Sequence, residues 1–227
     1  SYLLYQEKPK SSSLFSNELT SENKKYIIYA VFYLEWLMKT VLITGGSRGI
    51  GAELVRAFSK NGYNVAFTYR SSTDLANAIA EETGALAIKA DSRTECEVAA
   101  AVDKTVSRFG AVDCLINNAA ISSFSLFTDI TLEEWNDMLS VNLTGAFLYS
   151  KAVIPDMLKR KQGRIINVTS MWGLVGASCE VHYSAAKAGL IGMTKALAKE
   201  LGPSGITVNC IEPGVIDTEM NAALDED

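Results

Sequence analysis

From residue 39 onward, short apolar and β-branched runs alternate along the chain with longer helix-like segments. The short runs predict strands at residues 40–44, 64–69, 85–90, 114–117, 164–169 and 206–211. The longer segments predict helices at residues 50–60, 74–82, 95–109, 132–159 and 181–201. Such alternation is typical of βαβ units, in which parallel strands are covered by helices. The predicted fold class is therefore α/β, with a parallel sheet and helices on both faces.

The first 37 residues do not follow this pattern. Residues 1–25 are polar and rich in serine and lysine, whereas residues 26–37 form an apolar run interrupted by Glu35. That run is shorter than the roughly 20 apolar residues that span a bilayer, and no small-residue cleavage site follows it. We interpret residues 1–37 as an atypical extension that packs on the domain or on a partner, and residues 38–227 as one domain. Met38 is a candidate natural start.

Composition narrows the class of protein and of partner. The chain has 227 residues, of which 48% are hydrophobic and 21% charged, as in an ordinary globular domain. Its net charge of −5 argues against nucleic acid or an anionic membrane as the main partner. The four cysteines form no CxxC pair and there is one histidine, so no metal site is predicted. Reduced thiols of this kind suggest a cytoplasmic protein.

A glycine-rich turn, TGGSRGIG at residues 44–51, follows the first predicted strand and opens the first predicted helix. Gly45 would allow the tight turn, Gly49 would let backbone approach a pyrophosphate, and Gly51 would allow close packing of helix on strand. The free N–H groups of the helix N-terminus would face the phosphates. This context predicts a dinucleotide site rather than a simple strand-to-helix turn.

The end of the second predicted strand bears on which dinucleotide is bound. Sites for NAD place an acidic residue there, but this strand ends without one. Arg70 and Ser71 follow it, and Ser47 and Arg48 lie in the glycine-rich turn. These groups would surround a 2′-phosphate, which arginine binds with two hydrogen bonds. The pattern favours NADP(H), the alternative being that both arginines are solvated surface residues.

Tyr183 and Lys187 lie four residues apart, so they share one face of the predicted helix. A phenol beside an ammonium group loses its proton more easily than its ordinary pKa of about 10 implies. Such a tyrosine would exchange a proton with a carbonyl or an alcohol. With the dinucleotide site and Ser170 upstream, the pair predicts a nicotinamide-dependent oxidoreductase.

Taken together, these motifs resemble the short-chain dehydrogenase/reductase family from Thr40 to about Asp225. The resemblance implies a Rossmann-like doubly wound sheet. The markers occur in the family's order, and they are TGGSRGIG at 44–51, Asp91 after the third strand, NNAA at 117–120, Asn142 in SVNLTG, Ser170, YSAAK at 183–187 and PGVIDT at 213–218. The chain departs from the family at Ala120, where the motif usually has glycine. It also ends at Asp227, so the resemblance implies that the seventh strand and most of the lid are missing.

The resemblance implies a role for each matching residue. Tyr183 would protonate a ketone oxygen as hydride arrives, and Lys187 would lower the pKa of the tyrosine and bind the nicotinamide ribose. Ser170 would orient the substrate oxygen, and Asn142 would hold a water that links Lys187 to solvent. The implied cofactor-binding residues are Gly45, Ser47, Arg48, Gly49, Ile50, Gly51, Arg70, Ser71, Asp91, Ser92, Asn118, Ala119, Ala120, Tyr183, Lys187, Pro213, Gly214, Ile216 and Thr218.

Within the family, the stretches VAFTYRSS at 65–72 and YSAAKAGLIGMTKALAKEL at 183–201 resemble 3-oxoacyl-acyl-carrier-protein reductases of fatty acid biosynthesis. This implies NADPH-dependent reduction of a ketone, with a 3-oxoacyl thioester as the substrate. The stretch MWGLVGASCEVHYSAAK at 171–187 also resembles 5-aminopentanone reductases that act on modified elongation factor P. Glu180 in that stretch would attract a substrate amine or be a solvated loop charge, and His182 would line the site or cap the helix. A truncated nucleotide-binding protein without turnover remains an alternative.

Assembly is also suggested by the helices at 132–159 and 181–201, which carry small and apolar residues on more than one face. Small residues allow close helix packing between subunits, and family members usually pair through these helices. A homodimer is expected for this chain, and a tetramer for one with a complete C-terminus.

Overall fold

The structure is a computed structural model that describes residues 39–216. The predicted extension at 1–37 and the predicted cofactor residue Thr218 lie outside this range. No helix within 39–216 is both long and apolar enough to cross a membrane.

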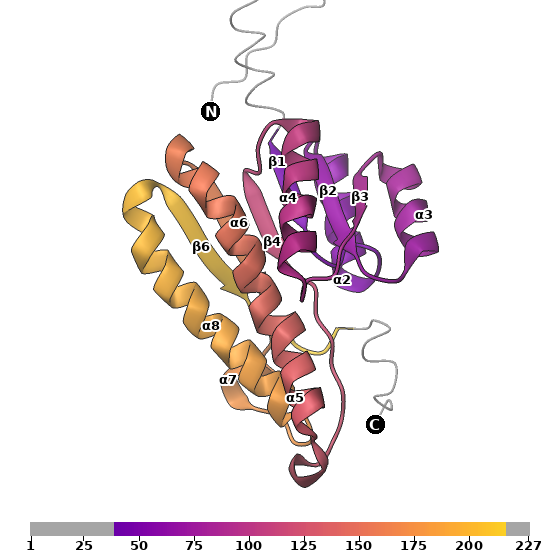
Figure 1. Ribbon diagram of the computed structural model, residues 1–227, viewed down its shortest axis with the longest axis vertical. Helices are drawn as coiled ribbons and strands as arrows, with labels where there is room; N and C mark the ends of the chain where they lie inside the picture. The colour runs from indigo at the N-terminus through magenta and orange to yellow at the C-terminus, as the bar shows by residue number, and fades with distance from the viewer. Residues whose placement is uncertain (1–38, 217–227) are drawn as a thin grey trace, which may run out of the picture. The chain divides into compact units, whose positions relative to one another are not determined.

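One parallel sheet organises the described part of the chain (Figure 1). Its strands are β1 (Thr40–Ile43), β2 (Asn64–Tyr69), β3 (Leu86–Lys89), β4 (Cys114–Asn117), β5 (Gly163–Val168) and β6 (Ile206–Ile211). Their order is β3-β2-β1-β4-β5-β6, and every neighbouring pair is parallel. This is the doubly wound order, so the predicted Rossmann-like class is confirmed. Residues 39–216 contain no seventh strand.

Helices cover both faces of the sheet (Figure 1). The α-helices of the described chain are α2 (Gly49–Lys60), α3 (Thr73–Thr83), α4 (Glu95–Phe109), α5 (Leu132–Leu139), α6 (Gly145–Arg160), α7 (Trp172–Val175) and α8 (Val181–Leu201). One core cluster joins the sheet to α4, α6 and α8, and a second joins it to α2 and α3. Leu42 and Ile43 illustrate the division: these neighbours on β1 are fully buried in opposite clusters because side chains alternate across a strand.

The helix predicted at 132–159 is divided in the structure. A turn of π-helix, η2 (Ser140–Thr144), separates α5 from α6. Asn142 lies in this turn, and its side chain binds the backbone of Ile121 in the segment that follows β4. Such π turns inside helices often mark functional sites. Apolar periodicity did not reveal the interruption, because it depends on a contact with a distant segment.

A buried chain of polar groups joins the sheet to the helices beneath the carboxyl ends of β4 and β5. Asn117 Nδ2 donates to Asn167 Oδ1 at 2.8 Å, between residues paired across these strands. Asn167 Nδ2 in turn donates to Thr194 Oγ1 on α8, also at 2.8 Å. Asn117 Nδ2 also lies 3.2 Å from Ser150 Oγ on α6. Because breaking a buried hydrogen bond leaves a costly unpaired group, these bonds hold the two strand ends against α6 and α8.

Candidate active site

A cavity of about 550 Å³ lies at the carboxyl ends of the strands. Its wall includes residues within two positions of the carboxyl end of each of the six strands, which the parallel arrangement brings to one edge of the sheet. The predicted catalytic and cofactor-binding residues in this wall are Gly45, Ser47, Arg48, Gly49, Ile50, Gly51, Arg70, Ser71, Asp91, Ser92, Asn118, Ala119, Ala120, Ser170, Tyr183, Lys187, Pro213, Gly214 and Ile216. Of the predicted site residues in the described range, Asn142 is the one that does not line it.

The glycine-rich turn has the geometry that its glycines suggested. Gly45 and Gly49 have φ angles of 69° and 52°, in the left-handed region that favours glycine. A Cβ on Gly51 would lie 2.1 Å from the carbonyl oxygen of Gly45 and 2.6 Å from Asn118 Nδ2. The first turn of α2 has no side-chain cap. The glycine-rich turn thus lies directly against the N-terminus of α2. The free backbone N–H groups there are suited to bind a phosphate.

Asn118 and Thr44 join the turns that follow β1 and β4. Asn118 Nδ2 donates to the carbonyl oxygens of Thr44 and Gly45, at 3.0 and 3.1 Å. Thr44 Oγ1 accepts from the backbone N–H groups of Asn118 and Ala119, both at 2.9 Å. Four hydrogen bonds therefore hold the two turns together where the two halves of the sheet meet.

The predicted adenine contact, Asp91, is held by a residue that the sequence analysis missed. Arg93 Nε lies 3.0 Å from Asp91 Oδ1, and Arg93 Nη2 lies 2.6 Å from Asp91 Oδ2. This pairing lowers the pKa of the Asp91 carboxyl, and the Arg93 backbone N–H contributes in the same direction. The guanidinium also pairs with Asp137 on α5. Asp91 is thus an ionised, oriented carboxylate in the cavity wall.

Burial dominates the electrostatics of Tyr183. It raises the pKa of the phenol; the charge of Glu180 raises this pKa further, while the hydrogen bond with Ser170 lowers it. The net shift of the Tyr183 pKa is therefore upward, opposite to the expected direction. Lys187 Nζ lies 5.6 Å from the centre of the phenol ring, and its role in lowering the pKa of Tyr183 stays a prediction.

Lys187 is fixed at the base of the site. Its side chain is almost fully buried, and Nζ donates to the carbonyl oxygen of Val168 at 2.9 Å. Burial lowers the pKa of Lys187 to about 8. With that pKa, about nine-tenths of the lysine carries its charge at pH 7. An ammonium has three N–H donors, and Val168 uses one of them.

Asn142 has a different position from the other predicted catalytic residues. Its Oδ1 accepts from the N–H of Ile121 and its Nδ2 donates to the carbonyl oxygen of the same residue, both at 2.8 Å. Asn142 and Lys187 both line a small space behind the main cavity. The side-chain amide therefore positions the segment after β4, and the water-holding role of Asn142 stays a prediction.

Glu180 lies in the cavity wall, although the sequence analysis left open that it was a solvated loop charge. The residue is 6% exposed, so that alternative is wrong. Burial raises the pKa of its carboxyl, and no hydrogen bond or ion pair of this carboxylate is found within residues 39–216. The carboxylate oxygens are not among the enclosed unpaired atoms of residues 39–216, so they open to the cavity and make Glu180 a candidate ligand contact.

The wall also includes Val215, from the expected cofactor segment 213–218, and three residues of the stretch before Tyr183 where substrate contacts are expected, Gly176, Ala177 and Ser178. The remaining cavity residues were not predicted, and they are Thr68, Tyr69, Ser72, Ala90, Ile121, Ser122, Phe124, Val141, Val168, Thr169 and Trp172. Several adjoin predicted residues at strand ends, a signal that sequence reasoning could have used. Phe124 comes from an irregular segment and Trp172 from the start of the short helix α7, and tertiary contacts decide the paths of both.

The sheet order, the glycine-rich turn and the cavity at the junction of its halves define a dinucleotide-binding α/β protein. Residues 39–227 match the family model described as short chain dehydrogenase, and the chain belongs to this family. This confirms the resemblance found in the sequence.

Several curated relatives have names that describe ketone reduction. The chain is 42% identical to a 3-oxoacyl-[acyl-carrier-protein] reductase FabG of Staphylococcus epidermidis over 194 residues, covering 83% of this chain and 80% of the relative. Identity to the 3-oxoacyl-[acyl-carrier-protein] reductase of Synechocystis is 42%, with coverage of 82% and 77%. Identity to the acetoacetyl-CoA reductase of Paracoccus denitrificans is 43%, with coverage of 84% and 78%.

The close contact between Gly51 and Gly45 allows the dinucleotide site to be tested by substitution. Gly51→Ala would place a methyl group 2.1 Å from a carbonyl oxygen, so the turn or α2 must shift. We expect a loss of about 1–3 kcal/mol in the free energy of unfolding, typical of overpacking, and weaker binding of NADPH. Urea denaturation and fluorescence titration measure the two effects.

Gly202→Ala is the matched control, since an added Cβ at Gly202 meets no atom within 4 Å and its φ of −53° suits alanine. Equal effects of the two substitutions on NADPH affinity would contradict the assigned contact.

Proposed function

We propose that the chain catalyses the NADPH-dependent reduction of a ketone to a secondary alcohol, with a 3-oxoacyl thioester as the substrate. The observation that carries this proposal is that Ser170, Tyr183 and Lys187 line the same cavity as the glycine-rich turn. Membership of the short-chain dehydrogenase family and the names of the relatives, all reductases of 3-oxoacyl groups, support it.

A bound nicotinamide cofactor would supply the hydride that reduces the carbonyl carbon. Ser170 would donate a hydrogen bond to the ketone oxygen, and Tyr183 would transfer its proton to that oxygen as negative charge develops on it. Burial raises the pKa of Tyr183, so the phenol is protonated at neutral pH, as an acid for reduction must be. Lys187 would stabilise the phenolate that remains and hold the cofactor ribose.

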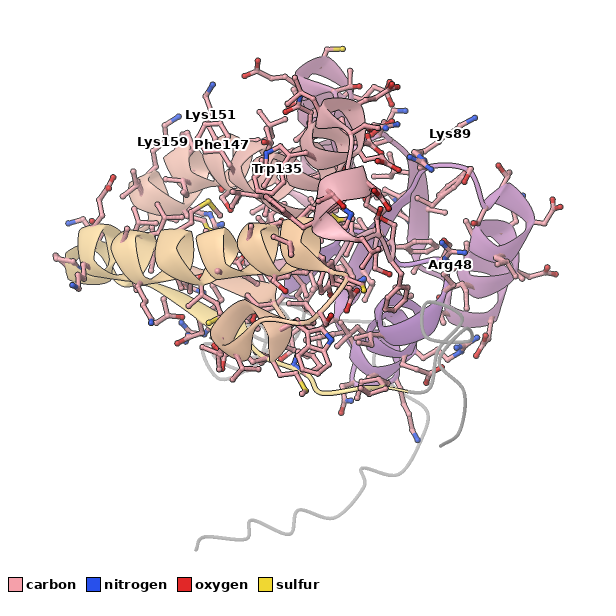
Figure 2. The ribbon with its side chains drawn as sticks, turned by 90° about the horizontal axis from the view of Figure 1, so that it is seen from below. Arg48, Lys89, Trp135, Phe147, Lys151 and Lys159 are labelled. Atoms are coloured by element: carbon pink, nitrogen blue, oxygen red, sulfur yellow. The ribbon has the colours of Figure 1, made fainter. Side chains whose placement is uncertain are left out.

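The choice of NADPH over NADH rests on the groups near the end of β2. Arg48, Arg70 and Ser71 all line the cavity, as does Ser47 of the glycine-rich turn. Figure 2 shows Arg48 at the start of α2, on the part of the molecule formed by the first half of the sheet. The end of β2 has no carboxylate that could bind the ribose hydroxyls, whereas an NAD site has one at this position.

Arg70→Ala tests the cofactor choice. Removing a charged donor to a phosphate should weaken NADPH binding by about 10- to 100-fold, the size of one charge-assisted hydrogen bond, and leave NADH binding unchanged. Isothermal titration with each cofactor measures both. Lys89→Ala is the control, because this basic side chain at the end of β3 is outside the cavity wall (Figure 2). Equal affinity of the unmodified chain for NADPH and NADH would refute the proposed preference for NADPH.

Tyr183→Phe tests the acid. The variant keeps the buried ring and removes the proton, so turnover of a β-ketoester with NADPH should fall by a factor of at least ~10². NADPH affinity should stay within about twofold, because the fold and Lys187 are retained. Tyr63→Phe, at a half-exposed tyrosine outside the cavity wall, is the control. Near-normal turnover by Tyr183→Phe would mean that another group supplies the proton.

A second candidate function is favoured by the buried carboxylate of Glu180. Its position in the wall beside Tyr183 suits a substrate that carries a protonated amine, which would pair with the carboxylate. A 5-aminopentanone group on modified elongation factor P has this chemistry. The resemblance of the 171–187 stretch supports the same alternative.

Glu180→Gln separates the two substrates. The substitution removes the charge at nearly constant shape, so kcat/KM for an amino ketone should fall by about 10- to 100-fold if the amine pairs with Glu180. For an uncharged β-ketoester, kcat/KM should change little. Asp129→Asn, at an exposed acid in the 3-10 turn before α5, controls for net charge. An equal effect on both substrates would remove the support for the amino ketone.

We also propose that the chain forms a homodimer through α6 and α8. Two of the small residues identified in the sequence, Ala188 and Gly192, are exposed one turn apart on α8. Ala186 is fully buried within the subunit, so it takes no part in this surface. Phe147 on α6 is half-exposed, and Lys151 lies over its ring at 5.8 Å (Figure 2).

Gly192→Arg tests the dimer. A long charged side chain would prevent close helix packing, so light scattering should show a dimer for the unmodified chain and a monomer for the variant. Ala78→Arg, at an exposed position on α3, is the control and should leave the dimer intact. A monomer in the unmodified chain would refute the proposal, and a tetramer would require a further interface.

A further inference from the structure

His182 precedes Tyr183 in the first turn of α8 and is fully buried, although it does not line the cavity. Its Nε2 lies 2.8 Å from the hydroxyl oxygen of Ser123. Its Nδ1 is buried without a hydrogen-bond partner. The tautomer with the proton on Nε2 has the lower free energy, because it leaves Nδ1 as an unpaired acceptor. The other tautomer would leave an unpaired N–H donor at Nδ1. With the proton on Nε2, the imidazole donates to Ser123.

Ser123 belongs to the segment between β4 and α5 that forms part of the cavity wall. Its neighbours Ser122 and Phe124 line the cavity. Ile121 is held by Asn142, and the N–H of Ser125 donates to the carbonyl oxygen of Cys179 at 2.8 Å. The segment is therefore fixed at residues 121, 123 and 125, and the two residues between these points line the cavity, as does Ile121 itself.

The contacts at residues 121, 123 and 125 join the segment to three different parts of the structure. Asn142 joins it to the π turn before α6, and the Cys179 contact joins it to the loop before α8. The contact between Ser123 and His182 joins it to the helical turn that carries Tyr183. It is thus the most direct connection between this wall and the proposed acid.

We propose that His182 is a positioning residue. Through its hydrogen bond with Ser123 it fixes the wall formed by Ser122 and Phe124 relative to Tyr183, and the substrate ketone must fit between this wall and the tyrosine. This inference rests on the proposed ketone reduction. His182 touches neither substrate nor cofactor in this role. A displacement of about 1 Å between a bound substrate and a catalytic group is enough to lower the rate by up to ~10²-fold, so a single wall contact affects the reaction.

Ser123→Ala removes the hydroxyl from an exposed position and should leave folding intact. We expect KM for the ketone to rise by about 2- to 10-fold, the size of one net hydrogen bond, with an unchanged dissociation constant for NADPH. His182→Ala should give the same pattern, and the double variant should be no worse than the more affected single variant. His182→Gln, which retains an N–H donor, should recover part of the loss. Ser125→Ala is the control, because Ser125 bonds through its backbone.

Hydrogen exchange measured by mass spectrometry gives a second result that does not depend on turnover. Ser123→Ala should accelerate exchange in residues 121–126 and leave exchange in α2 unchanged. Additive effects of the two alanine substitutions on KM, or unchanged exchange in 121–126, would overturn the proposal. Absence of ketone turnover in the unmodified chain would instead refute the proposed function, and the exchange experiment would still decide whether the wall is held by His182.

Discussion

The close contact between the turns that follow β1 and β4 is the constraint on which the rest of the site depends. Asn118 and Thr44 exchange hydrogen bonds across it, and Gly51 leaves no room for a side chain beside Gly45. The two turns meet where the strand order reverses, so the contact fixes the start of α2 relative to the second half of the sheet. A dinucleotide site built from both halves needs this relation to be rigid.

Burial then determines how the proposed catalytic groups behave. It raises the pKa of Tyr183 and lowers that of Lys187 to about 8, because both changes disfavour the charged form in a poorly hydrated site. The phenol is thereby kept as an acid, while the lysine retains most of its charge near neutral pH. Glu180 adds a negative charge that further raises the pKa of Tyr183, so the substrate end of the cavity favours protonated groups.

Much of the fold and of the cofactor half of the site could be predicted from the sequence. The strands were predicted correctly because apolar runs buried on both faces of a parallel sheet have a strong local signal. The glycines of residues 44–51 were interpretable because their positive φ angles and close contacts are requirements of the backbone itself. Tyr183 and Lys187 were paired correctly because helical spacing alone brings them to one face.

The tertiary structure alone decided the features that depend on distant segments. It divided the predicted helix at 132–159, since the π turn at Asn142 is tied to Ile121. It buried Glu180, which the sequence left as either an amine contact or a solvated loop charge, and His182, which the sequence left as a lining or a capping residue. It also reversed the expected pKa shift of Tyr183, because dehydration depends on every segment packed around the phenol. The sequence by itself therefore determined the strands, the glycine-rich turn and the order of the motifs, which are set by local backbone and periodicity; burial, hydrogen-bond partners and pKa values are properties of the assembled wall.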